Sequence, residues 1–305
     1  MTRAHRLRTA ALLVLLAVVA GDATAHDFLL DETPARAAPL PAGVQVQRDL
    51  HYGSADLQTL DVYRPAHAAD APLILMVHGG GWRLGDKMMS RTVDGKVARW
   101  VPRGFVFASA NYGLLPRTPV TQQVDDVAHA LAYVQQHAGD WGADPRKVIL
   151  MGHSAGAHLV AVLAADSTRA KSGGAQPWLG TIVLDSAVLD IPQLMQQRHL
   201  RLYDAAFGSA AAGRKTLSPI DLLTPAGAPL LVVCSTMRPD DSCGQSQRFA
   251  MRANALGRRA QVREEALTHA QINATLGNDG AYTEAVESFM KSLDAHVRAQ
   301  LEEKS

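Results

Sequence analysis

The middle of the chain carries short apolar runs that are nearly continuous rather than alternating. In order they read APLILMV (71–77), GFVFASA (104–110), RKVILMG (146–152), GTIVLDS (180–186) and APLLVVCS (228–235). Strands that are covered on both faces, as in a parallel sheet, typically show this pattern because neither face meets water. The runs therefore predict a parallel β-sheet at the centre of the fold.

Helical patterns separate these runs. Residues 118–138 have an apolar stripe at helical spacing, formed by Val120, Val124, Val127, Leu131 and Val134. Residues 154–165 are rich in small apolar side chains, as a buried helix is, and residues 281–303 form an amphipathic pattern at the end of the chain. Because strands alternate with helices, the sequence predicts an α/β fold with an open, mostly parallel, doubly wound sheet.

Three segments depart from this rhythm. Residues 44–53 and 57–65 alternate partially with period two, which predicts an antiparallel hairpin before the parallel strands. Residues 190–225 lie between two predicted strands and are too long for a simple crossover, so we expect a small cap-like insertion there. Residues 26–43 are rich in Ala and Pro and predict an irregular leader to a single α/β domain at 44–300.

The first 25 residues have the pattern of a secretory signal peptide. Residues 1–10 hold three arginines and a histidine, residues 11–20 are an apolar run, and Ala23-Thr24-Ala25 resembles a cleavage site. We therefore expect an exported protein, periplasmic or secreted. The alternative is an uncleaved N-terminal membrane anchor, although the apolar run is shorter than the roughly 20 residues of a membrane span. No later stretch reaches membrane length.

The charge balance argues against nucleic acid as a partner. The whole chain has 30 basic and 29 acidic side chains, and 27 and 28 of these remain once residues 1–25 are removed. A nearly neutral chain without a basic run has no electrostatic footprint for a phosphate backbone. Nothing in the sequence indicates an oligomeric state.

Two cysteines are present, Cys234 and Cys243. In an exported protein such a pair can form a disulfide, and the alternative is two unbonded thiols. Neither cysteine lies in a motif with the spacing of a zinc site, so we expect no metal.

Polar segments that follow predicted strands carry the candidate chemistry, because ligands bind at the carboxyl ends of strands in an open α/β sheet. The segment HGGGW (78–82) has three consecutive glycines, whose amides can face a developing negative charge. The segment GHSAG (152–156) places Ser154 between a strand and a helix, as in a nucleophile elbow. Ala155 would then offer a backbone N–H to the same oxyanion.

The candidate base and the candidate acids follow strands that come after Ser154 in the chain. His269 follows a predicted last strand and is the expected base. Asp240 and Asp241 follow the strand at 228–235, and either could orient a histidine; Asp185 and Asp190 also follow a strand and are weaker candidates. The chain order of serine, aspartate and histidine is that of α/β-hydrolases. The sequence therefore predicts a nucleophilic serine.

The segments HGGGWRLGDK, NYGLLP, DDVAHALAYV, DPRKVILMGHSAGAHLV and THAQIN resemble the carboxylesterases related to hormone-sensitive lipase, within the α/β-hydrolase superfamily. The resemblance runs from about Val44 to the C-terminal helix. It implies hydrolysis of a small-molecule carboxylic ester without metal or cofactor.

The resemblance also implies the roles of individual residues. Ser154 would be the nucleophile and His269 the base. Gly80, Gly81 and Ala155 would donate to the oxyanion, with Gly79 able to substitute for one of them. We choose Asp241 as the acid because Cys243 takes the apolar place that follows the family's acid by two residues, and Asp240 is the alternative. The loop STMRPDDSC departs from the family's Gly-x-x-Asp spacing, and Gly113 stands where many relatives have arginine.

Two other functions remain open. The same triad could cleave an amide, as in formamidase-like or peptidase-like relatives. The chain could also be a non-catalytic binding module on a hydrolase scaffold, because function depends on the site rather than the fold.

Overall fold

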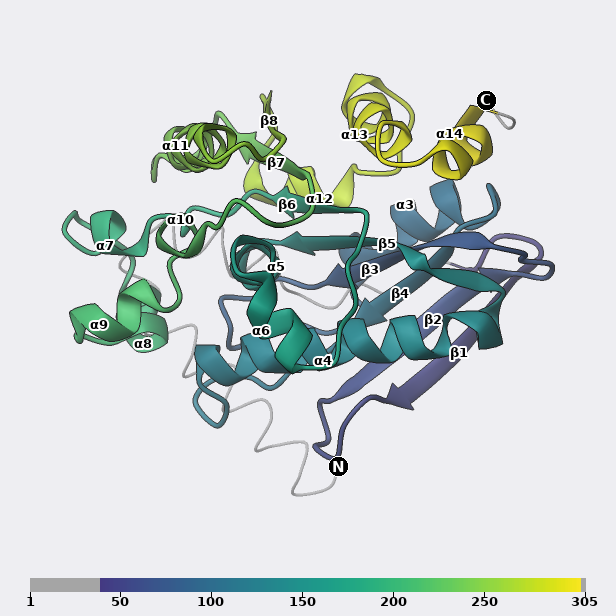
Figure 1. Cartoon of the computed structure of the whole chain (residues 1–305), viewed down its shortest axis with the longest axis horizontal. Helices are drawn as coiled ribbons and strands as arrows, with labels where there is room; N and C mark the ends of the chain where they lie inside the picture. The colour runs from purple at the N-terminus through teal and green to yellow at the C-terminus, as the bar shows by residue number, and fades with distance from the viewer. Residues whose placement is uncertain (1–38, 303–305) are drawn as a thin grey trace, which may run out of the picture. The chain divides into compact units, whose positions relative to one another are not determined.

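A mixed sheet of eight strands organises residues 39–302, the part of the chain that the computed structural model describes (Figure 1). The strand order is β1-β2-β4-β3-β5-β6-β7-β8. The strands are β1 (Val44–His51), β2 (Thr59–Pro65), β3 (Ala71–Val77), β4 (Val106–Ala110), β5 (Ala143–His153), β6 (Gly180–Leu184), β7 (Leu230–Ser235) and β8 (Ala260–Glu265). The predicted signal peptide and most of the predicted leader lie outside the described residues.

The sheet combines an antiparallel edge with a parallel centre. Strand β2 pairs antiparallel with both β1 and β4, and all pairs from β4 to β8 are parallel. The predicted N-terminal hairpin and the mostly parallel doubly wound sheet are thus confirmed. Strands β3, β4, β6 and β7 are buried at every position, which explains their unbroken apolar runs.

Helices cover both faces of the sheet, and the sheet divides the hydrophobic core into two clusters. Along β3, Leu73 and Leu75 belong to one cluster, and Ile74 and Met76 belong to the other, as the alternation of side chains in a strand requires. The first face is covered by α4 (Val120–His137), α5 (Ala155–Ala165), α6 (Ser167–Ser172) and α11 (Ser242–Ala255). The second is covered by α3 (Ser90–Trp100), α12 (His269–Ala274), α13 (Ala281–Lys291) and α14 (Ala295–Glu302).

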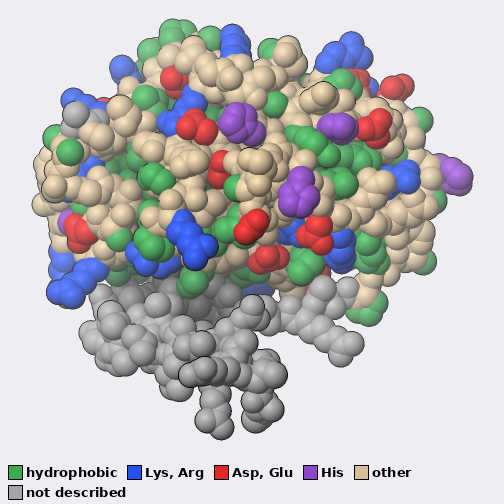
Figure 2. Space-filling view, turned by 90° about the horizontal axis from the view of Figure 1, so that it is seen from below, with side chains coloured by type: hydrophobic (Ala, Val, Ile, Leu, Met, Phe, Trp, Pro, Cys, Tyr) green, Lys and Arg blue, Asp and Glu red, His purple; other side chains and the backbone are tan. Residues whose placement is uncertain are grey.

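The helices α4 and α5 follow their sequence patterns. The predicted stripe of α4 is buried from Val120 to Val134, and all residues of α5 are buried. A short 3-10 helix (Ala138–Trp141) connects α4 to β5. Within residues 39–302, no helix is both long and apolar enough to cross a membrane. The face shown in Figure 2 has basic and acidic side chains interspersed.

Four short helices lie between β6 and β7, in the segment predicted as an insertion. They are α7 (Ile191–Leu194), α8 (Arg201–Phe207), α9 (Ala211–Lys215) and α10 (Pro219–Leu222). Helix α8 attaches to the rest of the fold through its aromatic side chains. The rings of Tyr203 and Phe207 pack edge-on against Trp82, with centroids 6.1 and 5.0 Å away. The HGGGW loop is therefore in direct contact with this segment.

A disulfide joins the end of β7 to the first turn of α11. The bond links Cys234 to Cys243, which are nine positions apart. This decides between the two alternatives that the sequence left open. The bond closes the loop between β7 and α11, and that loop adjoins the candidate active site.

Candidate active site

A sharp turn between β5 and α5 presents Ser154. Its backbone has φ 55° and ψ −118°, which is rare for a residue with a side chain and is characteristic of strained functional positions. The flanking glycines make this turn possible. A Cβ on Gly152 would lie 2.5 Å from the carbonyl oxygen of Gly156, and a Cβ on Gly156 would lie 2.3 Å from that of Val77. Both positions thus exclude any larger residue.

Three side chains from separate segments of the chain meet at this turn. His269 Nε2 lies 2.9 Å from Ser154 Oγ, and His269 Nδ1 lies 2.6 Å from Asp185 Oδ2. Because a carboxylate only accepts, the second contact assigns a proton to Nδ1 and leaves Nε2 to accept from the serine. The arrangement has the geometry and the chain order of a Ser-His-Asp triad.

The predicted acid is wrong, because neither Asp241 nor Asp240 contacts His269. Asp241 is at the N-terminus of α11 and its exposed carboxylate pairs with Arg248 at 3.2 Å. Asp240 pairs with Arg238, and Asp190 caps α7. The carboxylate at the histidine belongs to Asp185, which the sequence had marked only as a weaker candidate.

Asp185 is completely buried and fully hydrogen-bonded. Its Oδ1 accepts from the Ser235 amide at 2.9 Å and the Ser242 hydroxyl at 2.5 Å, and its Oδ2 accepts from His269 and from Arg238 Nη1 at 3.1 Å. Burial alone would raise the pKa of Asp185, but the Arg238 charge and the bonds from His269 and Ser242 outweigh it. They hold the pKa well below the usual range of a carboxyl. Asp185 is therefore ionised at neutral pH.

His153 supports the backbone of the candidate base. It is buried at the end of β5, its ring lies against the His269 ring with centroids 4.5 Å apart, and its Nε2 is 3.0 Å from the His269 carbonyl oxygen. Burial, with a smaller contribution from the neighbouring His269, lowers its pKa well below the usual value. His153 is therefore neutral and donates to the His269 carbonyl.

The glycine loop begins beside the elbow. A Cβ on Gly156 would come within 2.4 Å of the His78 carbonyl oxygen, so the start of α5 touches the loop directly. Gly80 and Gly81 have φ of 114° and 57°, and a Cβ on Gly80 would lie 2.1 Å from the Leu84 carbonyl oxygen. Ala155 is the first residue of α5, where backbone amides have no partner inside the helix. These three predicted oxyanion donors thus lie in adjoining segments.

Trp82 anchors the far end of the glycine loop. Its Nε1 donates to His158 Nδ1 at 3.3 Å, and its carbonyl oxygen accepts from the Leu115 amide at 2.8 Å. Burial lowers the pKa of His158 to about 4, against an opposing contribution from the Leu217 carbonyl. The neutral ring therefore donates from Nε2 to Leu217 at 2.8 Å and accepts from Trp82. These two hydrogen bonds connect the glycine loop to α5 and to the segment between β6 and β7.

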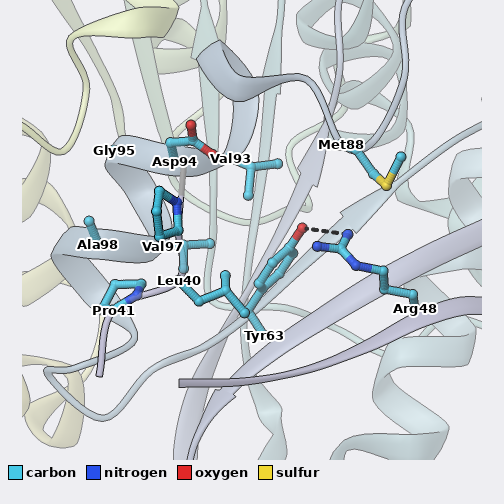
Figure 3. A pocket seen from close by; sticks show the side chains of 11 residues that line it. Leu40, Pro41, Arg48, Tyr63, Met88, Val93, Asp94, Gly95, Val97 and Ala98 are labelled. Atoms are coloured by element: carbon cyan, nitrogen blue, oxygen red, sulfur yellow. Dashed lines mark hydrogen bonds between the residues drawn. The ribbon is translucent and has the colours of Figure 1, made fainter. Parts of the chain in front are cut away.

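A cavity of about 260 Å³ lies elsewhere, between the residues before β1 and helix α3 (Figure 3). Its wall includes Leu40, Arg48, Tyr63, Met88 and Val97. Arg48 donates to the Tyr63 hydroxyl at 3.3 Å on one side of it. No triad residue lines this cavity, so the candidate site is the elbow and not this space. Among residues 39–302 there is no cluster of three or more His, Cys, Asp or Glu side chains arranged to hold a metal ion.

Curated relatives match part of the chain. The chain is 31% identical over 180 residues to a probable isoprenylcysteine alpha-carbonyl methylesterase of Oryza sativa subsp. japonica, covering 57% of this chain and 43% of that protein. It is 33% identical over 127 residues to esterase LipQ of Mycobacterium tuberculosis, covering 38% of this chain and 28% of that one. The chain thus spans less than half of either relative.

Solved structures match nearly the whole chain. Esterase B from Lactobacillus rhamnosis has a TM-score of 0.72 at 20% identity and covers 97% of this chain and 99% of its own. Esterase 2 from Thermogutta terrifontis has a TM-score of 0.65 at 22% identity, with 84% and 95% covered. At these identities the likeness establishes the α/β-hydrolase fold. A family model, BD-FAE, matches residues 60–250, which is more than half of the chain and includes the elbow, the glycine loop and Asp185. The chain therefore belongs to the BD-FAE family and has the α/β-hydrolase fold.

Proposed function

We propose that this protein is a serine hydrolase that cleaves carboxylic esters of small to medium size. The observation that carries the proposal is the continuous path from Ser154 Oγ through His269 to Asp185. The names of several relatives, which are esterases, support the choice of an ester as the bond.

In the proposed mechanism, His269 Nε2 takes the proton of Ser154 as Oγ attacks the ester carbonyl. The ionised Asp185 stabilises the imidazolium that results. The proton then passes to the leaving alcohol, and an acyl-enzyme remains on Ser154. Water attacks this intermediate by the same path and releases the acid.

The tetrahedral oxyanion is assigned to the amides of Gly80, Gly81 and Ala155. Preorganised amides of this kind typically lower the barrier enough that the loss of one costs about 10²–10³ in rate. The anchoring of Trp82 on His158 supports this role, because it fixes the loop that carries two of the three donors.

The test is hydrolysis of a chain-length series of p-nitrophenyl esters by the parent protein and by Ser154→Ala. Ser172→Ala is the matched control, since this serine is exposed on α6 and donates only to the Thr168 carbonyl oxygen. We expect the first variant to lose several orders of magnitude in kcat/KM and the control to match the parent. Activity that survives in a folded Ser154→Ala protein would exclude the proposed nucleophile.

An amide is the second candidate bond. The chain is 34% identical over 129 residues to kynurenine formamidase of Danio rerio. The discriminating assay compares an N-formyl arylamine with the matched aryl ester. A higher kcat/KM for the amide would replace the first proposal while keeping the triad.

We also propose that the protein is exported after cleavage behind Ala25. The disulfide supports this, because structural disulfides persist mainly in oxidising compartments. N-terminal sequencing of the exported protein should begin at His26, and a retained residue 1 in the membrane fraction would favour the anchor instead.

A further inference from the structure

The loop between β7 and α11 supplies most of the hydrogen bonds to the acid of the triad. Its two ends are joined by the disulfide between Cys234 and Cys243. Between these two cysteines, the Ser235 amide and the Ser242 hydroxyl donate to one oxygen of Asp185, and Arg238 donates to the other. This segment therefore provides donors to a carboxylate that follows the neighbouring strand β6.

Arg238 is the central member of this loop. Its side chain is only 10% exposed, and its Nη1 reaches both Oδ2 and the carbonyl oxygen of Asp185, at 3.1 and 3.0 Å. On its other side Nε and Nη2 make a two-pronged contact with the carboxylate of Asp240. The guanidinium is thus held in one orientation by an acid on either side, as bidentate pairs of this type are.

The same guanidinium touches the base. Arg238 Nη1 lies 2.8 Å from His269 Nδ1, and both nitrogens converge on Oδ2 of Asp185. The proton on His269 Nδ1 is directed at the carboxylate, and guanidinium nitrogens only donate. Arg238 therefore acts on the imidazole through its positive charge. A permanent positive charge at this distance makes the imidazolium less favourable, whereas Asp185 makes it more favourable.

We infer that Arg238 is a positioning residue that fixes Asp185 against His269 and brings a permanent positive charge to that pair. This inference rests on the proposed triad and deepens it. The charged and titratable groups that face Arg238 are Asp185, Asp240, His269 and Tyr203, and the ring of the neutral His153 packs against that of His269.

Tyr203 connects this pair to the segment between β6 and β7. Its hydroxyl is a hydrogen-bond partner of Arg238, and its ring packs against Trp82 of the glycine loop. Burial raises the pKa of Tyr203 above the usual value, so the hydroxyl stays protonated. Arg238 is thereby in contact, directly or through one residue, with the acid, the base and the loop of the oxyanion donors.

The experiment compares the parent protein with Arg238→Gln, Arg238→Lys and Arg248→Gln from about pH 5 to about pH 9. Arg248→Gln is the matched control, since it removes the same charge from a half-exposed pair with Asp241. Two readouts are taken at each pH: kcat/KM for an aryl ester, and the rate at which a fluorophosphonate labels Ser154. Thermal melting confirms that each variant is folded.

We expect Arg238→Gln to move the acidic midpoint of both profiles upward by about one pH unit, which is roughly a tenfold loss of rate below the midpoint. Arg238→Lys keeps the charge but not the two-pronged geometry, so its midpoint should stay with the parent while its plateau falls. Arg248→Gln should follow the parent throughout.

Each outcome decides the inference. Parental midpoints and plateaus in both folded Arg238 variants would overturn it, as would an equal shift in Arg248→Gln. If Arg238→Gln does not fold, the plateau of Arg238→Lys decides by itself. Labelling of Ser154 without ester hydrolysis would reject the ester proposal and leave the role of Arg238 to be read from the labelling profile. A parent protein that is not labelled at all would overturn both.

Discussion

Replacing Asp185 by asparagine is the sharpest perturbation of the site, because it changes one atom at the centre of four hydrogen bonds. The carboxylate has donors on both oxygens: His269 and Arg238 on Oδ2, and Ser235 and Ser242 on Oδ1. An amide has one oxygen and one NH₂ group. Whichever way it is turned, NH₂ faces groups that are themselves donors.

The two orientations set the magnitude. With NH₂ toward His269, the ring must take the other tautomer to accept from it, and Nε2 then carries a proton and cannot act as base. The loss of a triad carboxylate by this route is about 10⁴ in kcat. With NH₂ toward the Ser235 amide, the histidine keeps its tautomer but loses the anion that stabilises imidazolium, so we expect a smaller loss of about 10². The unfolding free energy should fall by about 2 kcal/mol, because a buried donor is left unsatisfied in either case.

The assay is kcat/KM for an aryl ester together with chemical denaturation, for Asp185→Asn beside Asp241→Asn. Asp241 is the matched control, since its carboxylate is exposed and paired only with Arg248. A folded Asp185→Asn protein that retained parental activity, or an Asp241→Asn protein with the larger loss, would show that the acid has been assigned to the wrong loop.

Three further outcomes are expected. Gly156→Ala should abolish activity and lower thermal stability, because the added Cβ would lie 2.3 Å from a carbonyl oxygen of β3; full activity in this variant would contradict the elbow geometry. Replacing Cys234 and Cys243 together by serine should lower the free energy of unfolding, measured by denaturation, by about 2.5 kcal/mol for a loop of this length. The same variant should lower kcat more than it raises KM. An unchanged kcat would show that the disulfide does not affect the active site. Stability should fall as the pH drops from 6.5 toward 4, because His158 has a folded-state pKa of about 4 and binds fewer protons in the folded than in the unfolded chain across that window. His158→Gln should reduce this pH dependence whereas His129→Gln, at an exposed position of α4, should not, and equal slopes in all three proteins would refute the assignment.

The sequence indicated the candidate nucleophile and the candidate base because their signals are local. A glycine on each side of Ser154, between an apolar run and a small-residue helix, specifies the turn without reference to the rest of the chain. His269 follows the last strand directly, whereas the other histidine beyond that strand, His296, lies within the amphipathic pattern at the end of the chain. The fold class followed in the same way from the apolar runs, whose continuity reports burial on both faces.

The acid could not be located in this way. Strands β6 and β7 are neighbours, so aspartates behind either strand reach the same edge of the sheet. Which one meets His269 depends on the direction of a few side chains: Asp241 turns back over the first turn of α11, where its Oδ1 lies 2.2 Å from the position of a Cβ on Gly244. Spacing alone does not encode that direction. The pairing of Arg238 with Asp240, two residues further along, is likewise visible only in the structure.

The two core clusters have a consequence for how activity is lost. The elbow belongs to α5, whose Ala155 and Ala157 lie in the core cluster of one face, whereas His269 begins α12, whose Ile272 lies in the cluster of the other. The 2.9 Å contact between serine and histidine therefore bridges two layers that could loosen independently. Separation of either layer from the sheet breaks that contact before the remaining layer unfolds. The enzymatic rate should thus decline at a lower denaturant concentration than the far-ultraviolet circular dichroism of the helices. The loss of turnover then reports the unfolding of the less stable layer.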